Sequence, residues 1–173
     1  MAQLLTQTTR QSGTWHDPVD RCTMTYDERF LRRRVVQTEK GDDLLVDLPK
    51  VTSLNHGDAF VLPNGEFIEV CAANEPLLAI TSDDLTRVAW HIGNRHTPCQ
   101  IDAHRLLIQR DHVLADMLSR IGAHLTEIVE PFTPEGGAYG HGRTHGHDHS
   151  HSHGPASDHT HTPAQKHEHT HEH

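Results

Sequence analysis

Apolar and polar side chains alternate over short stretches in roughly the first 72 residues, and this pattern predicts β-structure. The last two of the expected strands flank Asn64-Gly65, the dipeptide most typical of a two-residue hairpin turn. Strands separated by turns at such short intervals predict a small β-sandwich or barrel-like domain. Extended segments are expected at residues 29–38, 44–48 (ended by Pro49), 59–62 and 67–70.

Beyond this region, apolar residues recur in two places with the 3.6-residue period of a helix. The first helix follows a Ser82-Asp83 cap and ends at Gly93, and the second begins at Asp111 and ends at Gly122. Short strands are expected at residues 77–81, 99–102, 106–109 and 124–130. The apolar helix faces are expected to consist of Leu85, Val88, Ala89 and Ile92, and of Val113, Leu114, Met117, Leu118 and Ile121.

The expected order of these later elements is βαββαβ, the ferredoxin-like arrangement with two helices on one face of an antiparallel sheet. The predicted fold class is therefore α+β, with a small all-β domain over residues 1–73 and a ferredoxin-like domain over residues 74–135. Residues 136–173 offer too little apolar surface to form a core, so a disordered His-rich tail is expected there.

Residues 141–173 carry 12 of the 19 histidines of the chain. Neutral imidazole binds borderline divalent metals, with affinity rising from iron through cobalt and nickel to copper. Histidines on an unfolded segment can bind several ions but cannot impose one coordination geometry. The alternative is a solvated tail or a purification tag, although a tag is usually an unbroken run of histidine. The predicted metal ligands of the tail are His141, His145, His147, His149, His151, His153, His159, His161, His167, His169, His171 and His173.

Composition narrows the class of partner and the compartment. The formal net charge is −9, which argues against nucleic acid or an anionic membrane as the main partner. No basic region is followed by an apolar core at the N-terminus, and no stretch approaches about 18 apolar residues, so a cytoplasmic protein is expected. Cys22, Cys71 and Cys99 are widely spaced, and we expect reduced, mostly buried thiols that do not bind metal.

Two histidines of the body are expected to project into solvent. His96 lies beyond the helix stop at Gly93, in a loop or an irregular last turn. His112 lies almost opposite the apolar face of the second helix, and His91 lies off the apolar face of the first. A lone exposed histidine is usually not a ligand, but the metal-binding tail makes His96 and His112 candidate metal ligands.

Catalytic motifs are missing from the sequence. There is no His-Glu-x-x-His of the zinc hydrolases and no Gly-x-Ser-x-Gly nucleophile elbow. The glycine-rich stretch at 136–140 lacks the following Lys-Ser/Thr of a phosphate-binding loop, which excludes a nickel-inserting GTPase. The protein is therefore not expected to be an enzyme.

Several segments of the body together resemble the urease accessory protein UreE family. The Gly-Asn-Arg-His sequence at 93–96 and the Asp-His-Val-Leu sequence at 111–114 are the most specific of them. The resemblance covers nearly the whole body, and the tail is similar to the His-rich terminus of many members. The segments lie at residues 41–49, 57–58, 91–96, 111–118 and 131–139.

The resemblance implies an N-terminal β domain that binds peptides or partners and a ferredoxin-like domain that pairs into a homodimer. It implies that His96 from two subunits binds one nickel ion at the dimer interface, and that His112 belongs to an auxiliary surface site. Some members have a second histidine where this chain has Arg110. Zinc or copper could take the place of nickel, because both accept imidazole ligands.

The function implied by the resemblance is nickel delivery to apo-urease during assembly of its active site. The implied partners are apo-urease and the urease accessory proteins, including the nickel-inserting GTPase, and neither nucleic acid nor a membrane is expected. Two alternatives stay open: a cytoplasmic nickel or zinc buffer that passes metal to no partner, and a peptide-binding folding chaperone whose tail is incidental.

Metal binding by the tail is expected to depend steeply on pH. Imidazole ligates a metal only when it is neutral, and its reference pKa is about 6.5. Lowering the pH from about 7.5 to about 5.5 should therefore release most tail-bound nickel, as measured by equilibrium dialysis. Bound nickel that stays constant across this range would show that carboxylates hold the ions.

Overall fold

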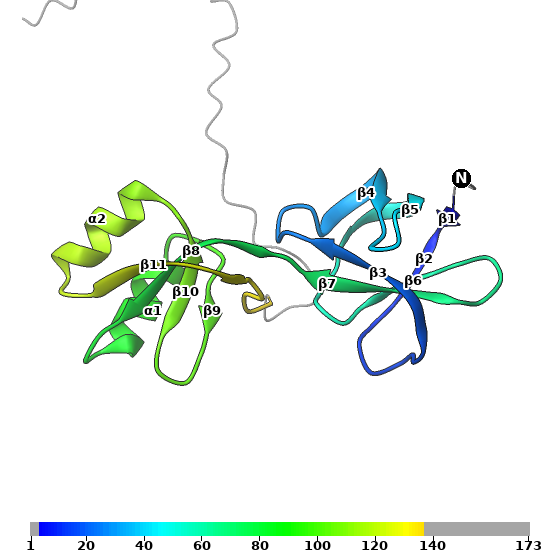
Figure 1. The fold of residues 1–173 in the computed structure, drawn as a ribbon. Coiled ribbons are helices and arrows are strands. Elements are labelled where there is room, and N and C mark those ends of the chain that lie inside the picture. Colours follow the sequence, from blue (N-terminus) through cyan, green and yellow to red (C-terminus); the bar gives the residue numbers. More distant parts are fainter. Residues whose placement is uncertain (1–3, 137–173) are drawn as a thin grey trace, which may run out of the picture.

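The computed structural model describes residues 4–136, and these residues form three sheets and two helices (Figure 1). The fold is mixed and consists mostly of strands, which agrees with the predicted α+β class. Neither helix in this part of the chain is long and apolar enough to cross a membrane. The predicted tail at 136–173 lies outside the described residues except for Gly136, so its expected disorder stays a prediction.

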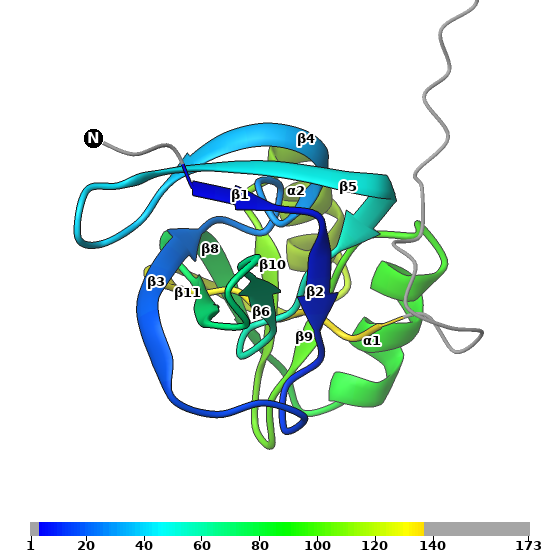
Figure 2. The ribbon, with the colours of Figure 1, turned by 90° about the vertical axis from the view of Figure 1, so that its right-hand side faces the viewer.

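Two sheets face each other in the N-terminal half (Figure 2). They enclose a core of buried side chains from both, including Leu44, Phe60 and Ile68. This arrangement agrees with the predicted β-sandwich. The first sheet has the order β1-β5-β4, with β1 at Leu4–Thr6, β5 at Asp43–Ser53 and β4 at Phe30–Gln37. The second has the order β2-β6-β7-β3, with β2 at Thr8–Arg10, β6 at Ala59–Val61, β7 at Phe67–Ala72 and β3 at Pro18–Met24.

The strand predicted over residues 44–48 is longer than expected. β5 continues through Pro49 to Ser53, so the prediction that Pro49 ends it is wrong. β1 pairs with β5 only as far as Val46, and Pro49 lies within the irregular part of β5, between the residues paired with Leu31 and Arg33 of β4. The missing N–H of Pro49 therefore costs the sheet no regular ladder hydrogen bond.

A third sheet forms in the C-terminal half, and each neighbouring pair of its strands is antiparallel. Its order is β11-β8-β10-β9, with β11 at His124–Pro131, β8 at Asn74–Thr81, β10 at Leu106–Gln109 and β9 at Gln100–Ile101. Together with α1 at Leu85–Gly93 and α2 at His112–Arg120, the elements follow the predicted order βαββαβ. β8 begins three residues before the expected strand, because its pairing with β11 extends to Asn74.

The helix caps agree with the predictions with one shift. Asp111 caps α2, and its carboxylate accepts the N–H of Leu114 at 2.8 Å. α1 is capped by Asp84 instead of the predicted Ser82-Asp83, and the Asp84 carboxylate accepts the N–H of Arg87 at 3.0 Å. The first turn of α1 therefore begins one residue later than the sequence pattern suggests.

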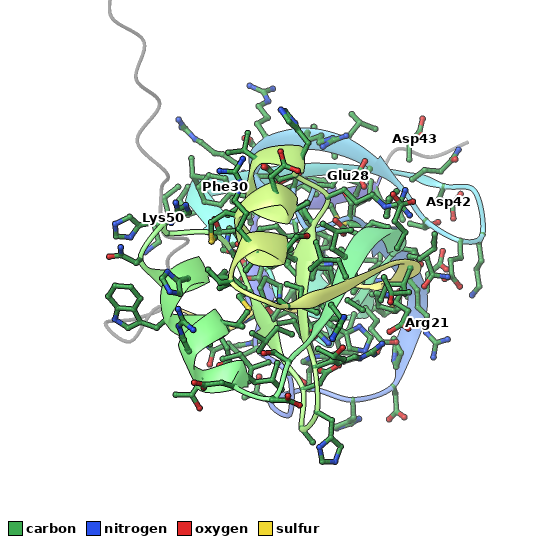
Figure 3. The ribbon with its side chains drawn as sticks, turned by 90° about the vertical axis from the view of Figure 1, so that its left-hand side faces the viewer. Arg21, Glu28, Phe30, Asp42, Asp43 and Lys50 are labelled. Carbon is green, nitrogen blue, oxygen red and sulfur yellow. The ribbon has the colours of Figure 1, made fainter. Side chains whose placement is uncertain are left out.

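Both helices cover the same face of the third sheet (Figure 3). Buried Leu114 and Leu118 of α2 pack there with side chains of α1 and of the sheet. Val113 was expected on this face but is 61% exposed. Steps of 100° per residue place Val113 about 120° from the line midway between Leu114 and Leu118, which explains the error. The opposite face of the sheet is covered by Phe132 and by Tyr26 from the β-sandwich half.

A buried arginine joins the two halves of the chain. Arg29 is 2% exposed and donates hydrogen bonds to the carbonyl oxygens of Met24 at 3.0 Å, Leu54 at 3.2 Å and Phe132 at 2.6 Å. The first two carbonyls belong to the β-sandwich half, whereas Phe132 directly follows β11. One guanidinium group therefore links the sandwich to the end of the third sheet.

Further contacts surround this junction. The rings of Tyr26 and Phe132 meet edge to face with 5.4 Å between their centroids. Glu75 is 5% exposed, and its carboxylate accepts the N–H of Tyr26 at 2.8 Å and the side-chain amide of Gln109 at 3.0 Å. Residues from both halves therefore share one hydrogen-bond network. Along the chain the two halves are linked by Ala73, which alone separates β7 from β8.

Replacing Arg29 with methionine should lower the free energy of unfolding by about 3 kcal/mol or more. The substitution removes three hydrogen bonds from a charged donor, each of which contributes about 1.5–3 kcal/mol. Burial of the methionine side chain offsets only part of this loss. Urea unfolding followed by circular dichroism measures the change. The matched control is Arg32→Met, at an exposed position where a change within about 0.5 kcal/mol is expected. An equally small loss for Arg29→Met would contradict the assigned role of this junction.

Candidate metal centre

His96 lies in the turn that follows α1. The helix ends at Gly93 with Asn94 as its C-cap, as predicted, and the N–H of His96 donates to the Gly93 carbonyl at 2.9 Å. His96 adopts a φ of +55°, in the left-handed region. This region is uncommon for residues other than glycine, and non-glycine residues held in it cluster at functional sites. The side chain is exposed, which confirms the predicted position.

His96 borders a surface pocket of about 220 Å³. Ala89 and Gly93 of α1 form part of its wall, and Ile101 of β9 lies in the pocket with 54% of its surface exposed. Trp90, the next residue after Ala89, is 63% exposed. An exposed apolar side chain, Ile101, therefore shares the pocket with His96, and exposed Trp90 lies on the same helix that forms part of the pocket wall.

Cys99 also lines the pocket, but it holds its proton firmly. Burial, helped by the nearby negative charge of Glu135, raises the pKa of the Cys99 thiol to about 11. The thiolate is the form that binds metals, so the described part of the chain offers little thiolate beside His96 at neutral pH. Burial also raises the pKa of Cys22 to about 12. All three cysteines are free, but only Cys22 is fully buried, whereas Cys71 and Cys99 are half-buried.

A charged network supports the wall of the pocket next to β9. Arg105 donates two hydrogen bonds to Glu130, at 3.1 and 2.6 Å, and one to Asp102 at 2.9 Å. A hydrogen bond from Gln100 and the guanidinium of Arg105 lower the pKa of Asp102, and Arg105 likewise lowers the pKa of Glu130. The network connects the turn between β9 and β10 to β11, which limits the movement of β9.

The other predicted ligands do not gather at this pocket. His112 is the first residue of α2 and is exposed, as expected, but it is not among the residues that line the pocket. Arg110 pairs with Glu127 at 3.0 Å. Within residues 4–136, no three His, Cys, Asp or Glu side chains are grouped closely enough to hold an ion. The twelve predicted ligands from His141 to His173 lie outside the described residues.

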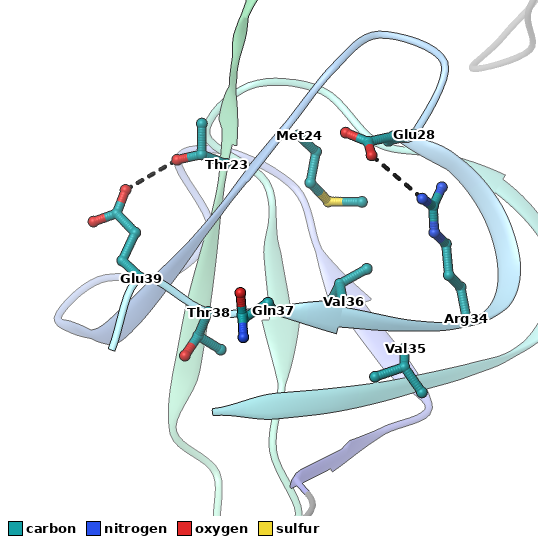
Figure 4. A pocket seen from close by; sticks show the side chains of 9 residues that line it. All are labelled: Thr23, Met24, Glu28, Arg34, Val35, Val36, Gln37, Thr38 and Glu39. Atoms are coloured by element: carbon teal, nitrogen blue, oxygen red, sulfur yellow. Dashed lines mark hydrogen bonds and ion pairs between the residues drawn. The ribbon is translucent and has the colours of Figure 1, made fainter. Parts of the chain in front are cut away.

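A second hollow, of about 370 Å³, was not predicted from the sequence and lies between β3 and β4 (Figure 4). These strands are the edges of the two sandwich sheets. The hydroxyl of Thr23 donates to Glu39 at 2.9 Å, Arg34 pairs with Glu28 at 3.3 Å, and buried Met24 contributes to the lining. The hollow lies between edge strands of two different sheets, so no local sequence signal marks it.

Comparison with known proteins gives the family. Residues 1–73 match the N-terminal domain model of the UreE urease accessory protein, and residues 75–173 match the C-terminal domain model. The chain belongs to the UreE urease accessory protein family. This confirms the resemblance seen in the sequence, and membership of UreE implies an accessory role in urease maturation.

Individual relatives agree with this assignment. The chain is 65% identical over 138 residues to the urease accessory protein UreE of Ruegeria pomeroyi, covering 80% of this chain and 93% of the relative. It is 62% identical over 135 residues to UreE of Ruegeria sp. (strain TM1040), covering 77% of each. It is 58% identical over 139 residues to UreE of Cereibacter sphaeroides, covering 80% of this chain and 76% of the relative.

The raised pKa of Cys99 predicts a slow, strongly pH-dependent alkylation. Because the thiolate is the nucleophile, the rate with iodoacetamide should rise about tenfold per pH unit from pH 7 to pH 10, still below the pKa of about 11. Mass spectrometry of the alkylated peptides measures each cysteine separately, with Cys22 as a slower internal reference. A rate that levels off near pH 9 would show that the thiol ionises as an ordinary solvent-exposed cysteine.

Proposed function

We propose that the protein is a nickel metallochaperone of the cytoplasm that delivers nickel to apo-urease during assembly of the urease active site. The observation that carries this proposal is the exposed imidazole of His96, held in a left-handed turn at the rim of a surface pocket. Membership of a urease accessory family supports urease as the destination of the nickel. The proposed partners are apo-urease and the urease accessory proteins, including the nickel-inserting GTPase.

The site is proposed to be completed by a second copy of the chain. One imidazole supplies one donor, and a two-fold axis near His96 brings a second one to the same ion. Trp90 and Ile101, which are 63% and 54% exposed, would be buried by the same contact. An ion shared between subunits lacks the closed set of ligands typical of a structural metal site, so it stays exchangeable.

The tail is proposed to raise the capacity for metal. Its 12 histidines collect nickel, and the His96 pair holds the ion that is passed on. His112 is exposed at the start of α2 and stands alone beside Arg110, so we assign it to weak auxiliary binding. Zinc and copper also accept imidazole, so both are expected to compete with nickel.

The N-terminal half is proposed to bind a peptide segment of a partner. The hollow between β3 and β4 is bordered by two sheet edges, and an extended peptide can add to such an edge as a further strand. A pulldown with urease accessory proteins separates this account from a metal buffer that has no partner. A folding chaperone with an incidental tail would instead bind partners equally well without nickel.

Replacing His96 with alanine should abolish tight nickel binding in a chain truncated after Gly140. The truncated parent should bind about one or two nickel ions per dimer, because neutral imidazoles at one shared site remain. Calorimetric titration measures the stoichiometry, and the melting temperature should not change because His96 is exposed.

His112→Ala in the same background is the matched control and should leave the tight site intact. Tight binding that survives His96→Ala would refute the assignment. A lower melting temperature with retained nickel affinity would instead make His96 a structural residue.

A further inference from the structure

The segment that follows β11 is held at successive points as it leaves the third sheet. The Phe132 side chain is fully buried, and the Phe132 carbonyl accepts the guanidinium of Arg29. The N–H of Thr133 donates to the side-chain oxygen of Gln100 at 2.8 Å. The N–H of Glu135 donates to the backbone carbonyl of Cys99 at 2.9 Å. Residues 132–135 therefore run alongside the start of β9 in a fixed course.

This course ends at the candidate metal centre. Glu135 and Gly136 line the same pocket as His96. The His-rich sequence begins at His141, five residues after Gly136. Five residues span at most about 18 Å, since an extended chain advances about 3.3–3.6 Å per residue. Gly136, which we call the root of the tail, is therefore held close to the His96 imidazole that would receive the ion.

Gln100 is the side chain that holds Thr133, the middle point of this course. Its amide nitrogen donates to Asp102 at 3.0 Å, and Asp102 is in turn held by Arg105 at 2.9 Å. The amide can satisfy Asp102 only with its N–H group, so its oxygen is turned towards Thr133, where it also accepts the hydroxyl at 3.3 Å. The charged network on β9 and β11 therefore fixes the acceptor to which the outgoing chain binds.

We propose that Gln100 is a positioning residue that holds the root of the tail at the His96 pocket, so that nickel passes from tail histidines to His96 within one molecule. This inference rests on the proposed function, because it assumes that His96 receives nickel. The physical basis is tethering, which gives the tail histidines a high effective concentration at the pocket. A tail anchored elsewhere on the body would reach His96 over a longer and less favourable path.

The expected change in the transfer rate follows from the number of residues between the last held residue and His141. With the Gln100 and Cys99 contacts in place, His141 lies five positions after Gly136, and it lies nine positions after Phe132 when both contacts are open. Without the Gln100 side chain, the Glu135 N–H bond to the Cys99 carbonyl is the one described hydrogen bond of this segment beyond Phe132, so the segment should open more often. For the disordered tail that the sequence predicts, effective concentration falls with about the −3/2 power of linker length, so full release of the segment should slow the transfer by at most about two- to threefold. The transfer rate should also be independent of protein concentration, as an intramolecular step requires.

The test compares full-length variants at position 100. Gln100→Met has a similar length but neither donor nor acceptor, so it should release Thr133. Gln100→Glu keeps an acceptor but loses the donor to Asp102 and places a second carboxylate beside it, so it should also weaken the Thr133 contact and slow the transfer. Thr133→Ala is the matched control, because it removes only the longer hydroxyl contact and keeps the N–H contact at 2.8 Å.

Stopped-flow mixing with one nickel ion per dimer, followed by quenching of tryptophan fluorescence, measures the transfer. The phase of fluorescence quenching that is missing in His96→Ala is assigned to nickel binding at His96. Hydrogen exchange of the Thr133 amide shows independently whether the contact is released. We expect Gln100→Met to exchange this amide faster and to slow the transfer by up to about two- to threefold, with an unchanged melting temperature.

The outcomes separate this inference from the proposed function. If Gln100→Met exchanges the Thr133 amide faster but transfers nickel at the wild-type rate, the positioning role is wrong while the His96 site stands. A Thr133 amide that exchanges no faster in Gln100→Met would also overturn the role of Gln100. If His96→Ala leaves every phase of the nickel signal unchanged, the proposed function fails, and this inference fails with it.

Discussion

The hydrogen bonds of the buried Arg29 guanidinium are the constraint on which the arrangement of the molecule depends. A charged group so far from water is stable only where several acceptors surround it, and Arg29 finds three carbonyl oxygens from two halves of the chain. Only Ala73 links β7 to β8, so this side chain does much to fix how the β-sandwich meets the third sheet. Its bond to Phe132 also sets where the chain leaves β11.

The candidate metal centre depends on this placement. From Phe132 the chain continues past Gln100 and Cys99 to the pocket that His96 borders. The same pocket exposes Ile101, so the course of the chain, the imidazole and an apolar surface come together at one place. The proposed centre would be suited to exchange, because the ion would not be enclosed by ligands from one chain. Storage would favour a closed set of ligands instead.

Features with local signals could be predicted from the sequence. The hairpin at Asn64-Gly65, the capped start of α2 at Asp111 and the exposed position of His96 depend on neighbouring residues alone. The family could also be inferred, because short sequences such as that at 93–96 carry a resemblance that the matches of the two domain models confirm.

Features that depend on distant parts of the chain could not be predicted in this way. β1 and β3 each pair in parallel with a strand about 40 or more residues away, so no hairpin turn marks either pairing in the sequence. The contact between Gln100 and Thr133 joins residues 33 positions apart and needs the sheet to be formed first. The left-handed backbone of His96 likewise has no sequence signal, since glycine is the usual residue there.

The central claim is that two copies of His96 hold one nickel ion between them. Anomalous X-ray diffraction from crystals of the nickel-loaded protein, recorded at the nickel absorption edge, tests it most directly. The account predicts a strong anomalous peak on a two-fold axis, within bonding distance of a His96 imidazole from each subunit. A strongest peak that is bound within a single subunit and away from His96 would contradict it.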